Sequence, residues 1–163
     1  EPALQYVMRD SGIEEKALGF LDSYFDNHFI STAPVNNKNI PLQLPCQFVN
    51  ILKNYGWNWD SVSNQQVFCN GILMQVNDNS PVLPIASGKV EQIIDGGNEE
   101  GFSILVKHDE SFYSYYGKLN KPSVSAGDNL SLVKPIGLSS GELYLELRNQ
   151  EGPIDPRTVF QEK

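Results

Sequence analysis

The sequence predicts a mainly β fold, an antiparallel β-sandwich or barrel with hairpins, preceded by an N-terminal α-helix. From Cys46 onward, short β-prone stretches alternate with turns that contain glycine and proline, a pattern typical of antiparallel sheets. No stretch after residue 50 shows a clear helical period, whereas residues 1–30 do. We therefore predict a helical segment with a linker over residues 1–43 and a β domain over residues 44–163.

The helical segment begins at a capping signal. Ser11 and Glu14 have the spacing of a capping box, in which two side chains satisfy the first free amides of a helix. The apolar residues that follow share one helix face; they are Ile13, Ala17, Leu18, Leu21, Tyr24 and Phe25. This face leaves two interpretations open, docking on the chain's own β domain or binding a partner. Residues 31–45 contain three prolines and Asn36-Asn37, which is the composition of a linker.

Five stretches predict strands of the β domain, because each is β-prone and is bounded by turn residues. They are residues 81–94, 102–107, 112–119, 130–136 and 143–147. The first contains Gly88 as a break, and the turn Gly96-Gly97 precedes the second. The third is rich in aromatic residues, so alternate side chains of it are a candidate surface for a partner while the others pack in the core.

Composition excludes several classes of function. A chain of 163 residues with 40% hydrophobic residues is long enough for one folded domain. Its net charge of −8 argues against nucleic acid and against direct adhesion to an anionic membrane. It has no apolar run of membrane-spanning length and no signal peptide, and it starts at Glu1, so we expect a fragment or mature ectodomain with an anchor upstream. Cys46 and Cys69 leave a disulfide and two buried thiols both open.

The C-terminal stretch carries a family resemblance. Residues 141–148 read Gly-Glu-Leu-Tyr-Leu-Glu-Leu-Arg, and a Gly-Pro-Ile-Asp-Pro turn follows at 152–156. This resembles the last strand and exit turn of the lysostaphin-type (LytM) zinc endopeptidases, which cut bacterial peptidoglycan cross-bridges. In that family the strand reads Gly-x-His-Leu-His-Phe-Glu-Val-Arg. Glu142 and Tyr144 stand here in place of the two histidines.

Other fragments match the same family in the same order, from about Leu44 to Phe160. They are Tyr-Gly-Trp at 55–57, Cys-Asn-Gly-Ile-Leu at 69–73, the hairpin 81–90, Val-Lys-His-Asp at 106–109, Tyr-Gly-Lys-Leu at 116–119, Val-Ser-Ala-Gly-Asp at 124–128 and Pro-Ile-Gly at 135–137. The resemblance implies a LytM-like β-sandwich of the barrel-sandwich hybrid type. Lipoyl or biotinyl carriers share the hairpin pattern, but their modified lysine motif and the paired histidines of sugar phosphotransferase domains are missing from this sequence.

The resemblance also implies that the zinc chemistry is lost. A catalytic zinc needs about three protein ligands and an open position for water. The positions that would hold or assist zinc are all changed; they are Cys69, Leu73, Lys118, Glu142 and Tyr144. The two histidines of the chain do not replace them, since His28 lies outside the resemblance and His108 matches a position that is not a ligand. We therefore predict no catalytic residue, no metal site and no cofactor.

Two states of the former cleft remain open. Leu73, Tyr144 and Cys69 would fill it while Lys118 pairs with Glu142, or a groove would remain that binds a peptide or a partner. The candidate binding residues are Tyr113, Tyr115, Tyr116, Lys118, Glu142 and Tyr144.

The resemblance predicts a pseudoenzyme that binds or scaffolds another envelope protein outside the cytoplasm. Degenerate relatives of three types suggest the partner class: stage II sporulation protein Q, the activators of cell-wall amidases, and the inactive partners of cell-shape endopeptidases. The partner would be a hydrolase, an amidase or a membrane-anchored protein. The alternatives are non-hydrolytic binding of peptidoglycan and a peptidoglycan endopeptidase with a rebuilt metal site.

Overall fold

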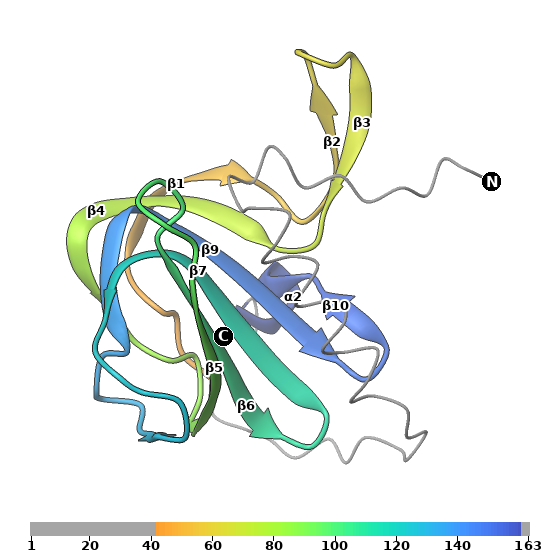
Figure 1. Ribbon diagram of the computed structural model, residues 1–163. Coiled ribbons are helices and arrows are strands. Elements are labelled where there is room, and N and C mark those ends of the chain that lie inside the picture. Colours follow the sequence, from red (N-terminus) through yellow and green to blue (C-terminus); the bar gives the residue numbers. More distant parts are fainter. Residues whose placement is uncertain (1–41, 161–163) are drawn as a thin grey trace.

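The computed structural model describes residues 42–160, with side chains to residue 158, and shows a curved antiparallel sheet with a projecting hairpin (Figure 1). Its strands are β1 (Phe48–Lys53), β2 (Gly56–Asp60), β3 (Gln65–Cys69), β4 (Ile72–Val82), β5 (Gly88–Asp95), β6 (Phe102–Asp109), β7 (Phe112–Pro122), β8 (Asn129–Leu130), β9 (Gly137–Asn149) and β10 (Gly152–Ile154), and a short helix α2 (Pro156–Phe160) follows. The prediction of a mainly antiparallel β fold is confirmed. The predicted N-terminal helix lies outside the described residues.

The sheet has the strand order β1-β4-β9-β7-β6-β5-β8, and β10 pairs with β9. Every one of these pairs is antiparallel. β2 and β3 form a separate two-stranded sheet, which extends away from the main sheet in Figure 1. The long strand β9 is central, because β4 and β7 flank it and β10 pairs with its end.

The sheet curves around one hydrophobic core. Residues from β4, β5 and β8, which are far apart in the strand order, belong to the same cluster of buried side chains. Its members are Ile72, Met74, Val76, Val82, Ile85, Ala86, Val90, Ile104, Val106, Tyr116, Leu119, Leu130, Ile136, Leu143, Leu145 and Leu147. Loop hydrogen bonds extend the strand pairing, from Ile136 N to Val82 O beside β4 and β9 and from Val90 N to Asp128 O beside β5 and β8.

The central strand β9 is buried on both faces. Its odd-numbered residues Leu143, Leu145 and Leu147 belong to the main core. Successive side chains of a strand point to opposite faces, so Tyr144, Glu146 and Arg148 share the other face, where they are also buried. Residues 143–148 of the family-like segment are therefore interior on both sides, whereas Gly141 and Glu142 are only partly buried.

The structure corrects some strand boundaries. Residues 81–94, predicted as one strand, contain the end of β4, a loop and then β5. Residues 130–136 mostly form a turn after the two-residue strand β8. Residues 72–80 of β4 were not predicted as a strand; in the structure the polar run Asn77–Ser80 lies at bulges between β4 and β9. Cys46 and Cys69 are free thiols. In the part of the chain described, no helix is long and apolar enough to cross a membrane.

Candidate functional site

The central strands bring three of the substituted positions together. Leu73 on β4 lies directly opposite Tyr144 on β9, and Gly117 on β7 lies opposite Tyr144 from the other side. Cys69 ends β3, and the turn that follows it packs on Tyr144, since a Cβ atom at Gly71 would lie 3.0 Å from Cζ of that ring. Cys69, Leu73 and Tyr144 therefore form one cluster, as the resemblance implied for the positions of the zinc ligands.

Tyr144 fills the centre of this cluster. Its side chain is fully buried, and its hydroxyl donates a hydrogen bond of 2.7 Å to Glu146 Oε1. The ring of Tyr115 meets it edge-on, with 6.2 Å between the ring centroids. Burial raises the pKa of Tyr144 well above its usual value, and the negative charge of Glu146 raises it further. The phenol is therefore protonated, and its hydroxyl is already used as a hydrogen-bond donor to Glu146.

A close approach of two backbones makes this arrangement possible. A Cβ atom at Gly71 would lie 2.3 Å from the carbonyl oxygen of Leu145 and 3.0 Å from Cζ of Tyr144. Only glycine fits against the strand and the tyrosine ring at this position. Gly71 thus allows the turn between Cys69 and Leu73 to pack directly on Tyr144.

Glu146 is a buried carboxylate whose two oxygens are both occupied. Oε1 accepts from Tyr144, and Oε2 accepts from Arg148 Nε at 2.5 Å. Arg148 is nearly buried as well, so the pair is an interior ion pair with little access to water. A buried pair of this kind depends on both partners, because removal of either leaves an uncompensated charge.

Cys69 is also engaged within the protein. Its thiol donates to the carbonyl oxygen of Gly71, with 3.1 Å between sulfur and oxygen. Burial raises the pKa of the Cys69 thiol to about 11. Since the thiolate is the form that binds metals, this cysteine is not prepared to act as a ligand at neutral pH.

The residues of the cluster do not fit a zinc ion. Leu73 offers no donor atom, the Cys69 thiol donates to the Gly71 carbonyl, and Tyr144 directs its hydroxyl to Glu146. Catalytic zinc instead takes imidazole, carboxylate or thiolate ligands and keeps one open position. Within residues 42–158, no group of three or more histidine, cysteine, aspartate or glutamate side chains could hold a metal ion.

Lys118 and Glu142 form the ion pair that the sequence left open. Their Nζ and Oε1 atoms are 3.4 Å apart, with Lys118 mostly buried and Glu142 partly exposed. Lys118 has a φ of 66°, a left-handed conformation that is uncommon for a residue with a side chain. This conformation lies at an irregularity between Gly117 and Leu119 in the pairing of β7 with β9, and Ser140 Oγ donates to the Lys118 carbonyl at 2.7 Å.

The prediction of an exposed tyrosine surface on β7 is wrong. Tyr113, Tyr115 and Tyr116 are all buried, as is Tyr144 on β9. The physical reason is that both faces of β7 are covered, because Tyr116 belongs to the main core and Tyr115 packs edge-on against Tyr144 on the opposite face. Tyr116 accepts a hydrogen bond of 2.8 Å from the amide of Ile85, so it holds a loop instead of a partner. Of the candidate binding residues, Lys118 and Glu142 keep some exposure.

His108 has a structural role that the resemblance did not specify. Its Nδ1 lies 2.8 Å from the Ser87 carbonyl oxygen and its Nε2 lies 2.7 Å from Ser114 Oγ. A carbonyl only accepts, so Nδ1 carries the proton and the neutral ring accepts from Ser114 at Nε2. Burial lowers the pKa of His108. The ring therefore ties the loop before β5 to β6 and β7 in its neutral form.

Comparison with known proteins is consistent with this geometry. A curated lipoprotein NlpD/LppB homologue from Pseudomonas aeruginosa is 26% identical over 114 residues, which are 62% of this chain and 38% of that protein. A zinc-containing peptidase from Vibrio cholerae superposes with a TM-score of 0.62 and 20% identity, covering 72% of this chain and 39% of the other. A chain from the complex of SpoIIIAH and SpoIIQ gives a TM-score of 0.60 at 18% identity and covers 76% of this chain and all of that one.

The two structural similarities show the fold alone, because both are at low sequence identity. This chain spans less than half of the lipoprotein homologue and of the Vibrio cholerae peptidase. The family pattern named Peptidase family M23 matches residues 67–156, which is more than half of the chain. That range contains every substituted position discussed above, from Cys69 to Tyr144. The chain therefore belongs to peptidase family M23.

Proposed function

We propose that this chain is a catalytically inactive M23 domain that binds another protein of the bacterial cell envelope. The proposal rests on the positions where the family holds zinc, Cys69, Leu73 and Tyr144, here called the former metal position. The polar side chains there are already hydrogen-bonded within the protein. Tyr144 and Cys69 donate to Glu146 and to the Gly71 carbonyl, Leu73 packs beside them, and Lys118 pairs with Glu142. No group of this cluster is left as a base, a nucleophile or a metal ligand.

Hydrolysis would require this cluster to be taken apart. A zinc ion at the position of Tyr144 would have to displace a buried phenol and leave Glu146 without one of its two donors. Deprotonation of Cys69 would be opposed by burial and by the nearby negative charge of Glu146. Each step costs stability, because an unpaired buried polar group costs about 1–3 kcal/mol. The arrangement therefore favours a domain that keeps the fold of the family but does not carry out zinc-dependent hydrolysis.

Similar proteins support the envelope location and the binding role. The similar Pseudomonas aeruginosa protein is named a lipoprotein homologue, and one structural neighbour was solved as a complex of two different proteins. By extension, we place this chain outside the cytoplasm, where it would contact an envelope protein such as a wall hydrolase, an amidase or a membrane-anchored partner. The net charge of −8 does not favour the anionic cell wall as its main ligand.

The decisive test is zinc binding combined with hydrolysis. Purified protein is titrated with zinc by calorimetry and incubated with purified peptidoglycan, with and without EDTA. We expect no stoichiometric zinc binding and no release of peptides. The triple substitution Cys69→His, Leu73→Asp and Tyr144→His is the matched control, which should gain zinc affinity if the backbone geometry of the family is retained.

Two results would overturn the proposal. One is stoichiometric zinc binding by the native chain that is lost in Cys69→Ala, together with EDTA-sensitive peptide release. The other is co-sedimentation with purified sacculi as tight as that of a known wall-binding domain, which would make the wall itself the ligand.

A further inference from the structure

The exposed apolar side chains of this protein are concentrated in one stretch. Of the nine large hydrophobic residues that are exposed in the described part of the chain, eight fall within residues 42–62, the apolar strip. They are Leu42, Leu44, Phe48, Val49, Leu52, Trp57, Trp59 and Val62; the ninth is Val133. Scattered exposed hydrophobic residues are normal on a protein surface, but a concentration of this kind marks an interaction site.

The same stretch is nearly free of charge. Within residues 42–62 the sequence contains two charged residues, Lys53 and Asp60, and Asp60 is buried. The whole chain has 20 acidic residues and a net charge of −8. Depletion of charged residues and enrichment in aromatic residues are the features that distinguish the centre of a protein interface from other surface.

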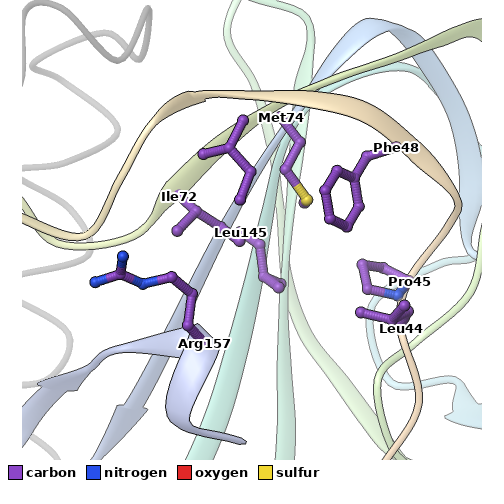
Figure 2. A pocket seen from close by; sticks show the side chains of 8 residues that line it. Leu44, Pro45, Phe48, Ile72, Met74, Leu145 and Arg157 are labelled. Carbon is purple, nitrogen blue, oxygen red and sulfur yellow. The ribbon is translucent and has the colours of Figure 1, made fainter. Parts of the chain in front are cut away.

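A cavity opens beside the strip. It has a volume of about 160 Å³ and is lined by Leu44, Pro45, Phe48, Ile51, Ile72, Met74, Leu145 and Arg157. Figure 2 shows Ile72, Met74 and Leu145 as the floor on β4 and β9, with Phe48 and Pro45 on one side and Arg157 on the other. Arg157 is the one charged residue of this lining. A cavity of this size and polarity suits one large apolar side chain.

Side-chain contacts connect the cavity to the β2–β3 hairpin. The ring of Phe68 on β3 meets Tyr55 and Trp57 edge-on, with centroid separations of 5.5 and 5.2 Å. Arg157 at the cavity donates to Asn54 at 3.5 Å, and the Asn58 amide of the hairpin donates to the Asn54 carbonyl at 2.9 Å. The hairpin and the cavity are therefore parts of one surface.

The hairpin presents both tryptophans of the chain on one face. Trp57 and Trp59 are two residues apart on β2, so their side chains point the same way, and they are 49% and 58% exposed. Tryptophan is among the residues that most often dominate the energy of a protein interface. All eight exposed residues of the strip precede residue 67, where the match to family M23 begins. The surface thus belongs to the part of the described chain that the family pattern does not cover.

The backbone of β1 indicates how a partner would dock. β1 is an edge strand, but its pairing with β4 has irregularities between Phe48 and Asn50 and between Ile51 and Lys53. Bulges twist an edge and hinder the addition of another strand. Docking through side chains into the cavity is therefore favoured over continuation of the sheet.

We propose that the apolar strip and its cavity bind a segment of a different protein, in which one large aliphatic or aromatic side chain flanked by lysine or arginine enters the cavity. This inference rests on the proposed binding function and identifies its surface. The flanking charge follows from complementarity, because the charges of the strip and its cavity cancel locally, Lys53 against Asp60 and Arg157 against Asp155, and the chain as a whole carries a net charge of −8. Two copies of this chain would instead bring two acidic bodies together.

The two tryptophans provide a reporter for the test, because they are the only ones in the chain and both lie in the strip. The probes are the synthetic peptides acetyl-Lys-Lys-Leu-Phe-Lys-Lys-amide and acetyl-Glu-Glu-Leu-Phe-Glu-Glu-amide, which contain no tryptophan. We expect a saturable change in tryptophan emission with the basic peptide and at least tenfold weaker binding of the acidic peptide. Leu44→Lys and Phe48→Lys, at exposed positions of the cavity lining, should each weaken binding of the basic peptide at least tenfold.

The matched control is Val133→Lys, an equally charged change at an exposed apolar residue outside the strip, which should leave binding unchanged. Equal binding of the two peptides, or equal binding by Leu44→Lys and Val133→Lys, would overturn the inference. So would dimerisation in sedimentation runs that Leu44→Lys abolishes, since the occupant would then be a second copy. The zinc and hydrolysis assays do not involve this surface, so they can fail or succeed independently of it.

Discussion

The former metal position and the apolar strip differ in how their side chains are satisfied. At the former metal position the polar groups are buried and paired, with Tyr144 on Glu146 and Glu146 on Arg148. In the strip the apolar groups are exposed, and Trp57 and Trp59 extend on a hairpin away from the main sheet (Figure 1). The polar groups of the first region find their hydrogen-bond partners within the chain, whereas the second region leaves apolar side chains exposed to water. A site that is internally complete supports the fold, and a surface that is incomplete is the place to look for a partner.

The largest expected effect comes from breaking the buried pair. Glu146→Ala removes the acceptor that Tyr144 and Arg148 share, and it takes the paired carboxylate away from a buried arginine. We expect a loss of about 3–5 kcal/mol in the free energy of unfolding, measured by urea denaturation. Glu142→Ala, on the same strand but partly exposed, is the control and should change stability little. A loss below 1 kcal/mol for Glu146→Ala would show that the region is not internally supported.

A smaller loss is expected from Tyr144→Phe. This change keeps the ring in the cluster and removes only the hydrogen bond to Glu146, which involves a charged acceptor. Such bonds contribute about 1.5–3 kcal/mol. A double-mutant cycle with Glu146→Gln isolates this bond from other effects. If Tyr144→Phe were as stable as the native protein and also bound zinc, the paired state of this region would not be what excludes the metal.

The stability of the fold should depend on pH through His108. Its pKa is lowered in the folded state by burial, so the unfolded chain takes up the proton first as the pH falls. The contribution of His108 is therefore fully present above its unfolded pKa of about 6.5 and is lost as the pH falls from there toward the lower folded pKa. Thermal midpoints of native protein and His108→Gln between pH 8 and pH 5 measure it. The native midpoint should fall more over this range, and parallel curves would contradict the neutral-ring assignment.

The smallest effect is expected for the ion pair between Lys118 and Glu142. It lies at the edge of the cluster with Glu142 partly exposed, so water screens it. We expect a coupling energy below about 1 kcal/mol in a double-mutant cycle with Lys118→Ala and Glu142→Ala, and a decrease with added salt. A coupling energy of several kcal/mol would contradict this expectation. It would show that the pair stabilises the fold in the way that the buried pair of Glu146 and Arg148 is expected to.

Much of the fold could be predicted from the sequence, because its motifs occur in a specific order. The retained Glu146-Leu147-Arg148 and the turn at Gly152–Pro156 predicted a strand and exit turn, which the structure shows as β9 and β10. Residues 72–80 of β4 were missed, and only the bulged pairing with β9 makes the polar run Asn77–Ser80 part of a strand.

Surface assignment was less predictable. The tyrosines of β7 were expected to be exposed in part, yet they are buried because other side chains pack on both faces of this strand. A period of two shows which residues share a face, but it does not show whether that face is covered. The spacing of Trp57 and Trp59 was a usable signal for the hairpin face, although the cavity beside it combines residues that are about a hundred positions apart.

By itself, the sequence determined which side chains stand at the positions of the family's zinc ligands. Residue identity alone shows that leucine at position 73 offers no donor atom and that glutamate and tyrosine replace the histidines of the last strand. Only the tertiary structure decided what those residues do instead. Protonation and pairing depend on burial and on neighbours from other strands, which bring Cys69, Tyr144 and Glu146 together. The exposure of the apolar strip was decided in the same way, because solvent access depends on which elements pack over a segment and not on its composition.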